Sequence, residues 1–173
     1  MTQPIRIEDE RKFLVAPDTD WRTTAKPYAK HIVDRYLSCG RLRLRQMTDT
    51  DNGKVAYKLT KKPGAISAYH QPIETLYLSE SEYQTFLPLD GVDLTKTRHY
   101  HHANGQVFGI DVFEDELSGL VICEAEADSL EQLKAIAFPP YAGIEVTENP
   151  FFTGGTLCKA SAADLARELA RAL

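Results

Sequence analysis

Hydrophobic and polar residues alternate along most of the first two thirds of the chain, with the period of two that is typical of β-strands. The alternating segments are residues 5–15, 31–37, 41–47, 55–62, 72–78, 95–102, 106–114 and 120–128. Asn104-Gly105, between the sixth and seventh segments, is typical of a two-residue hairpin turn. Sequential strands with short connections favour an antiparallel barrel. We therefore predict an α+β fold built on an eight-stranded antiparallel β-barrel, in a single domain spanning residues 1–173.

Helical signals lie between and after these strands, so the helices are expected to pack outside the barrel. The predicted helices cover residues 79–87, 128–138 and 161–173, and a short helix broken at Pro27 is expected within 21–30. The last helix begins at Ser161, has Asp164 three residues on, and is expected near one mouth of the barrel. Two roles are open for it. It either packs permanently on the barrel or forms a plug hinged at Gly154-Gly155, with Lys159 at its base.

Charged residues occupy alternate positions on several predicted strands, which gives each of these strands one ionic face. The faces carry Glu8, Glu10 and Lys12; Arg41, Arg43 and Arg45; Lys58 and Lys62; Arg98; and Glu124 and Glu126. One interpretation places them on a solvated outer surface, where charge runs usually lie. Because one strand is purely cationic and another purely anionic, the other interpretation turns these faces inward to line a lumen. Such a lumen suits one phosphate chain chelated to Mg²⁺ or Mn²⁺.

Composition narrows the classes of function. The 173 residues are 43% apolar and 26% charged, and the net charge of −5 argues against a nucleic-acid surface and against binding to an anionic membrane. No stretch approaches the roughly 18 apolar residues of a membrane span, and no apolar leader is visible, so we expect a cytoplasmic protein. Cys39, Cys123 and Cys158 are widely spaced and expected to be reduced. The sequence leaves a homodimer open.

Several short motifs occur in a fixed order. Glu8-Asp9-Glu10-Arg11-Lys12 is an ExExK sequence; after it come Arg41-Leu42-Arg43-Leu44-Arg45, Leu59-Thr60-Lys61-Lys62, Glu74, Thr97-Arg98, Ile110-Asp111-Val112-Phe113 and Glu124-Ala125-Glu126. Together they resemble the CYTH superfamily, the triphosphate tunnel metalloenzymes, from Ile7 to about Lys159. The resemblance implies an eight-stranded tunnel that binds a triphosphate with a divalent metal, and it is greatest to the bacterial inorganic triphosphatases.

The resemblance also implies roles for individual residues. The metal ligands would be Glu8, Glu10, Asp111, Glu124 and Glu126, with Mg²⁺ or Mn²⁺ as the cofactor. The phosphates would be bound by Lys12, Arg41, Arg43, Arg45, Lys58, Lys62 and Arg98. The catalytic group would be Lys12, Glu10, Asp111 and Arg43. The roles of Arg41 and Glu74 stay open, Glu74 being either an inward carboxylate or a salt-bridge partner of the arginines.

The expected activity is hydrolysis of inorganic triphosphate to pyrophosphate and phosphate by metal-activated water. Four alternatives remain: a nucleoside triphosphatase, a thiamine triphosphatase, a class IV-type adenylate cyclase, and a polyphosphate-binding module without turnover. His99, His101 and His102 are close in sequence, but alternation places His102 on the opposite strand face, which disfavours a zinc site. They are expected to be strand-end residues.

Overall fold

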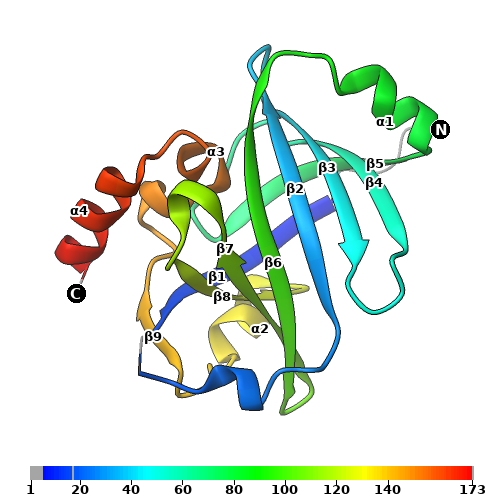
Figure 1. Cartoon of the computed structure of the whole chain (residues 1–173). Coiled ribbons are helices and arrows are strands. Elements are labelled where there is room, and N and C mark those ends of the chain that lie inside the picture. The colour runs from blue at the N-terminus through cyan, green and yellow to red at the C-terminus, as the bar shows by residue number, and fades with distance from the viewer. Residues whose placement is uncertain (1–5, 17, 173) are drawn as a thin grey trace.

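A computed structural model describes residues 6–16 and 18–172 and shows a closed β-barrel (Figure 1). Its strands are β1 (Arg6–Val15), β2 (Ala29–Leu37), β3 (Leu42–Asp49), β4 (Val55–Lys61), β5 (His70–Leu78), β6 (Gly91–Ala103), β7 (Gln106–Phe113) and β8 (Val121–Ala127). They neighbour one another in the order β5-β4-β3-β2-β6-β7-β8-β1, and a pairing of β1 with β5 closes the ring. Every pairing is antiparallel. The predicted barrel is confirmed.

The hairpin between β6 and β7 forms at the predicted turn. Asn104 and Gly105 both have positive φ, 53° and 74°, as a type I′ turn requires. A ninth strand, β9 (Ala142–Glu145), is not predicted by the sequence. It pairs with the end of β1, from Phe13 to Val15, on the edge that β5 occupies only from Arg6 to Asp9. Four residues carry too little alternation to be recognised as a strand.

The remaining elements are short helices. They are η1 (Trp21–Thr23), α1 (Glu80–Phe86), η2 (Asp115–Leu117), α2 (Leu130–Ala135), η3 (Pro150–Phe152), α3 (Gly154–Leu157) and α4 (Ala162–Ala172). α1 begins with a capping box between Ser79 and Glu82, as the sequence indicates. Of the short helix expected within 21–30, only η1 forms, and the rest of that prediction is wrong. The Lys26 N–H donates to the Tyr100 carbonyl at 2.7 Å instead, and β2 begins two residues after Pro27. No helix in the described ranges is both long and apolar enough to span a membrane.

Side chains that point into the barrel change character along its axis. At one end they are apolar and form a core cluster; in the middle they are ionic; at the other end aromatic and cationic residues surround an opening. The core cluster includes Leu14, Leu94, Phe113 and Ile122. A second cluster covers the outer faces of β1, β7 and β8, where Phe13, Phe108, Ile110 and Cys123 pack with Trp21. The ionic faces therefore point inward and apolar faces outward, as the second interpretation of the charge pattern requires.

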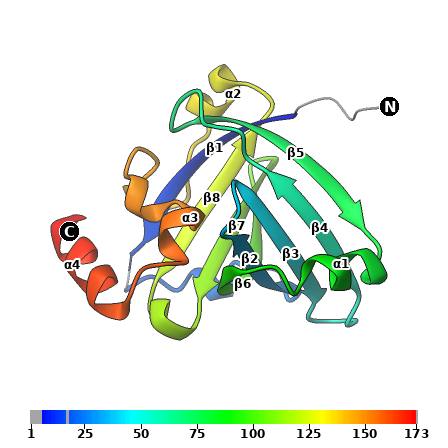
Figure 2. The ribbon, with the colours of Figure 1, turned by 90° about the horizontal axis from the view of Figure 1, so that it is seen from above.

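The apolar end of the barrel is closed by the segment after β9. Phe152 of η3 and Leu157 of α3 are each 2% exposed and pack with the core cluster inside the barrel. α4 adds Leu165 to the same cluster, and Figure 2 shows α3 and α4 on the side of the barrel away from α1. The closing elements are thus η3 and α3. The sequence left open whether the last helix packs permanently or forms a plug, and α4 packs on the core cluster. The plug alternative placed a hinge at Gly154-Gly155. These two glycines form the first turn of α3 instead.

Candidate active site

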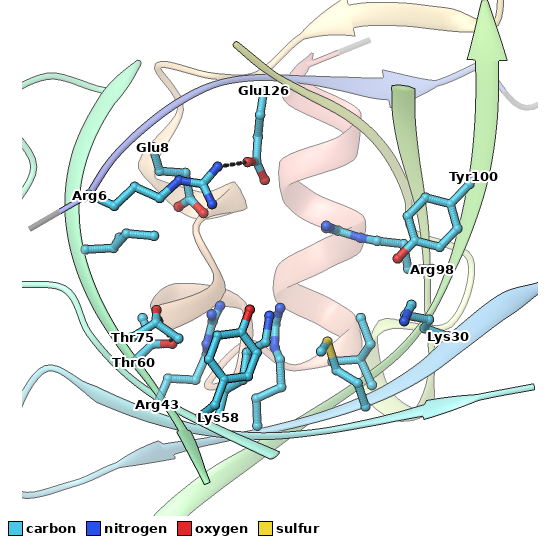
Figure 3. Close-up of a pocket in the computed structure, with 15 residues that line it drawn as sticks. Arg6, Glu8, Lys30, Arg43, Lys58, Thr60, Thr75, Arg98, Tyr100 and Glu126 are labelled. Carbon is cyan, nitrogen blue, oxygen red and sulfur yellow. Dashed lines mark hydrogen bonds and ion pairs between the residues drawn. The ribbon is translucent and has the colours of Figure 1, made fainter. Parts of the chain in front are cut away.

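Two connected cavities occupy the barrel interior (Figure 3). The wide compartment, of about 390 Å³, opens beside Tyr77 and Tyr100. The narrow compartment, of about 100 Å³, lies deeper and ends against Phe152, Gly154 and Leu157. Both are lined by Glu8, Arg43, Arg45, Arg98 and Glu126. The interior is therefore a tunnel with one wide mouth and one closed end.

The glutamates predicted as metal ligands all line the narrow compartment. They are Glu8, Glu10, Glu124 and Glu126. Strand pairing brings them together, since Glu10 lies opposite Glu126 in the register of β1 and β8. Figure 3 shows Glu8 and Glu126 on one wall and Arg43 on the opposite wall. Acidic β1 and β8 thus face the basic strand β3 across the tunnel.

Each acidic side chain of this wall has a cationic neighbour. Lys62 Nζ is 2.9 Å from Glu8 Oε2, and Lys12 Nζ is 2.7 Å from Glu10 Oε1. Burial opposes ionisation of Glu10, but the charges of Lys12 and Lys62, with the hydrogen bond from Lys12, together lower the Glu10 pKa. For Glu126, burial and then the charges of Glu8 and Glu10 raise the pKa. The wall accordingly holds more negative charge than its cations neutralise locally.

This donor set is suited to a divalent ion. Magnesium and manganese prefer carboxylate oxygens, and four glutamates line the narrow compartment, with Glu10 directly opposite Glu126 in the strand register. In the described part of the chain no three His, Cys, Asp or Glu side chains already converge on one point, because Lys12, Lys62 and Arg98 separate the carboxylates.

The basic wall is anchored by an aspartate that the sequence did not single out. Asp34 of β2 is 1% exposed, and Arg45 donates Nε and Nη2 to its two oxygens at 2.5 and 2.6 Å. Arg43 Nε is 3.6 Å from Asp34 Oδ1 and, within the described chain, has no hydrogen-bond partner although it is buried. Burial opposes ionisation, but the two arginines lower the pKa of Asp34 to about 2. Asp34 therefore fixes cations whose outer surfaces face the tunnel.

Asp111 lies behind the tunnel wall rather than on it. It is 0% exposed and is not among the residues that line either compartment. Arg98 donates Nε and Nη2 to its two oxygens at 2.6 Å each, and Lys96 is also paired with it. Gly109 makes room for this arrangement, since a Cβ there would lie 3.3 Å from Arg98 Nε. Both Asp111 oxygens hold cations in this geometry, so Asp111 positions Arg98, and its predicted role as a metal ligand stays a prediction.

The other predicted residues divide between tunnel and surface. Lys58 lines the wide compartment, but Arg41 lines neither, because β3 begins at Leu42 and leaves Arg41 beyond the barrel end. Glu74 is exposed on the outer face of β5, so neither role considered for it is confirmed. His99 packs edge-on against Trp21, at 5.1 Å between ring centroids, and His101 Nδ1 lies 2.5 Å from the Tyr141 hydroxyl.

Sequence reasoning missed several residues of the site. Besides Asp34 these are Arg6, Lys30, Lys96, Tyr77 and Tyr100. Lys96 is 7% exposed, and burial, which outweighs Asp111, lowers its pKa. Its position two residues before Arg98 on the same strand face was an available signal.

The closed end depends on a glycine. A Cβ on Gly154 would lie 1.9 Å from Tyr36 Oη and 2.9 Å from Cζ, whereas a Cβ on Gly155 would meet no atom within 4 Å. We expect Gly154→Ala to lower the free energy of unfolding by about 1–3 kcal/mol, as overpacking does. Gly155→Ala should leave it unchanged or raise it. Urea unfolding measures both, and Tyr36→Phe should reduce the Gly154→Ala penalty; equal stability of the two alanine variants would contradict this packing.

Comparisons with known proteins agree with this geometry. The chain is 32% identical over 144 residues to a protein of Nitrosomonas europaea named inorganic triphosphatase, a match that covers 82% of this chain and 90% of that protein. The crystal structure of the inorganic triphosphatase NE1496 superposes with a TM-score of 0.57 at 27% identity, covering 88% of this chain and 95% of the other. No family model matches the chain.

More distant structures share the fold. The PH1819 protein of Pyrococcus horikoshii OT3 has a TM-score of 0.54 at 19% identity and covers 74% of this chain and 82% of its own. At that identity the likeness concerns the barrel alone.

Proposed function

The chain belongs to the CYTH superfamily of triphosphate tunnel proteins, and from this premise we propose that it hydrolyses inorganic triphosphate to pyrophosphate and orthophosphate. The observation that carries the proposal is the opposition of a glutamate wall and an arginine wall in one narrow tunnel. A binder of anions alone gains little from a row of carboxylates, whereas a metal-chelated phosphate chain needs both signs of charge.

Charge supports a polyanionic substrate despite the acidic chain. The described lining of the two compartments holds nine Lys and Arg residues against four Glu, and buried Asp34 and Asp111 reduce this excess of five cations to three. Arg43, Arg45 and Arg98 would bind the bridging and terminal phosphate oxygens from the basic side. Lys58 and Lys30 near the wide mouth would meet the chain as it enters. The rest of the chain therefore carries −8, so the net charge of −5 does not describe the tunnel.

Glu8, Glu10, Glu124 and Glu126 would hold the divalent cofactor, Mg²⁺ or Mn²⁺. When bound, that ion supplies charge neutralisation at the phosphate oxygens and a water of lowered pKa. Lys12, whose pKa is raised chiefly by Glu10 and Glu124 against the effect of burial, stays protonated and binds a phosphate oxygen next to the carboxylates. Asp111 and Asp34 keep Arg98, Arg43 and Arg45 in place without reorganisation during the reaction.

The proposed reaction is a single displacement at phosphorus. A water oxygen forms a bond to the terminal phosphorus, the anhydride P–O bond breaks, and the bonding electrons leave with pyrophosphate. The water proton passes to solvent or to a product oxygen. Lys12, Arg43 and Arg98 stabilise the charge that builds on the phosphoryl and leaving oxygens. The scheme uses no Ser or Cys nucleophile, and Cys123 is buried outside the barrel with a pKa raised to about 12 by burial and then by Glu124.

A substrate panel tests this function. We expect phosphate release from inorganic triphosphate with Mg²⁺ or Mn²⁺ and none after chelation with EDTA, because the ion that neutralises the phosphate oxygens and lowers the pKa of the attacking water is then missing. ATP and thiamine triphosphate should be hydrolysed at least about tenfold less efficiently, since the Tyr77 face is already covered by Lys58, 4.9 Å from its centroid. Tight triphosphate binding without metal-dependent release would indicate a binding module, and a cyclic product from ATP would indicate a cyclase.

A further inference from the structure

A third cavity lies outside the closed end of the tunnel. This exit groove, of about 500 Å³, is bounded by the ends of β2 and β3, by the loop between β4 and β5, and by α3. Its lining includes Tyr36, Arg41, Arg43, Lys62, Gly155 and Lys159. The groove contains Arg41, which was predicted to bind phosphate but lines neither tunnel compartment. It also contains Lys159, which was predicted at the base of the plug.

The charged side chains of the exit groove are all cationic. Arg41, Arg43, Lys62 and Lys159 line it, and the described lining contains no Asp or Glu. The narrow compartment differs, because Glu8, Glu10, Glu124 and Glu126 of β1 and β8 line it. An anion that passes from the narrow compartment into the groove therefore leaves the carboxylates behind, and the charged residues that it meets are cations.

Side chains separate the groove from the tunnel. Tyr36, Arg43 and Lys62 line both the narrow compartment and the exit groove. Lys62 bridges this wall to Glu8 at 2.9 Å, and the buried Arg43 Nε has no hydrogen-bond partner in the described chain. Rotation of long side chains is fast compared with backbone rearrangement. A small anion could thus pass without any movement of the barrel.

The order of products makes such a passage useful. Under the proposed function, the substrate enters by the wide mouth and its terminal phosphoryl group reaches the glutamates of the narrow compartment. Cleavage there leaves orthophosphate at the deep end, with pyrophosphate between it and the mouth. We propose that the exit groove is a second anion site that takes up this orthophosphate and releases it, past Lys62, Arg41 and Lys159, while pyrophosphate leaves through the wide mouth. The proposal rests on the proposed function.

Blocking the groove tests the proposal. Gly155 lines the groove, and a Cβ there meets no atom within 4 Å, so Gly155→Phe places a ring in the groove without a backbone clash. Rapid mixing with inorganic triphosphate and Mg²⁺ compares phosphate formed, after acid quench, with free phosphate, reported by a phosphate sensor. In the wild type the two curves should coincide. In Gly155→Phe about one phosphate per enzyme should form at the normal rate, and its release should be at least fivefold slower.

Matched variants complete the experiment. Gly155→Ala should behave as the wild type, and the exposed Lys159→Glu should slow release without filling the groove. Coincident formation and release in both Gly155→Phe and Lys159→Glu would overturn the exit groove and show that both products use the wide mouth. Absence of any phosphate formation in the wild type would instead overturn the proposed function, so the two failures are distinguishable.

Discussion

Asp34→Asn is expected to lower the free energy of unfolding by about 3–5 kcal/mol at pH 7, because it leaves two buried arginines without their carboxylate. Inorganic triphosphate, added without metal, should recover more stability in the variant than in the wild type. The ligand then supplies the negative charge that Arg43 and Arg45 have lost, and it binds the folded state only. Urea unfolding with and without triphosphate measures both effects.

An exposed pair of the same geometry provides the control. Arg35 donates Nε and Nη2 to Asp93 at 2.8 and 3.0 Å, but Asp93 is 48% exposed. Asp93→Asn should cost less than about 1 kcal/mol, as surface ion pairs do. If Asp34→Asn is no worse than Asp93→Asn, or if triphosphate stabilises both variants equally, Asp34 does not anchor the basic wall.

The pH dependence of stability follows from the same carboxylate. Its pKa in the folded protein is about 2, below the ordinary value near 3.8, so the folded state favours the ionised form. The contribution, about 2 kcal/mol, is complete above the unfolded pKa and is lost as the pH falls from about 4 to 2. Asp34→Asn should lack this part of the acid unfolding curve.

Much of the barrel could be predicted from the sequence, because a period of two assigns side chains to strand faces directly. All eight alternating segments are strands, and the ionic faces of β1, β3 and β8 line the tunnel. Alternation alone does not say which face is inside. That assignment came from the separation of like charges on different strands, which an outer surface would not require.

Sequence reasoning misplaced several residues, each for a local reason. Arg41 follows the same alternation as Arg43 and Arg45 in the sequence. It precedes the first residue of β3, however, and outside a strand alternation does not assign a side chain to a face. On β5, Ile73, Thr75 and Tyr77 point inward, and Glu74 points outward. Apolar residues lie on both faces of this strand, so the sequence did not show which face Glu74 occupies. The closing role of α3 depends on a contact between Gly154 and Tyr36, which are distant in sequence.

Asp34 and Lys96 show a different limit. Asp34 is a lone carboxylate between Ile32 and Tyr36 on its strand face, so no row of like charges marks it, and Lys96 has only Arg98 beside it on its own face. Their function depends on pairing across strands: Asp34 lies opposite Arg45 in the β2–β3 register, and Lys96 reaches Asp111 on the next strand. Buried counter-charges of this kind are set by register, which a single sequence does not reveal.

Glu10→Gln is expected to lower kcat for inorganic triphosphate by about 10²–10³-fold, the scale of losing one preorganised electrostatic contact in a phosphoryl or acyl transfer site. The variant should need more Mg²⁺ for half-maximal rate, since one carboxylate of the glutamate wall is gone. Its fold should persist, because Lys12 keeps Glu124 and Glu8 as counter-charges. Glu74→Gln, the same change on the exposed outer face of β5, should alter kcat less than about twofold. Steady-state phosphate release across a Mg²⁺ series measures kcat and the Mg²⁺ requirement of both variants. Full activity of Glu10→Gln would show that the glutamate wall takes no part in the mechanism.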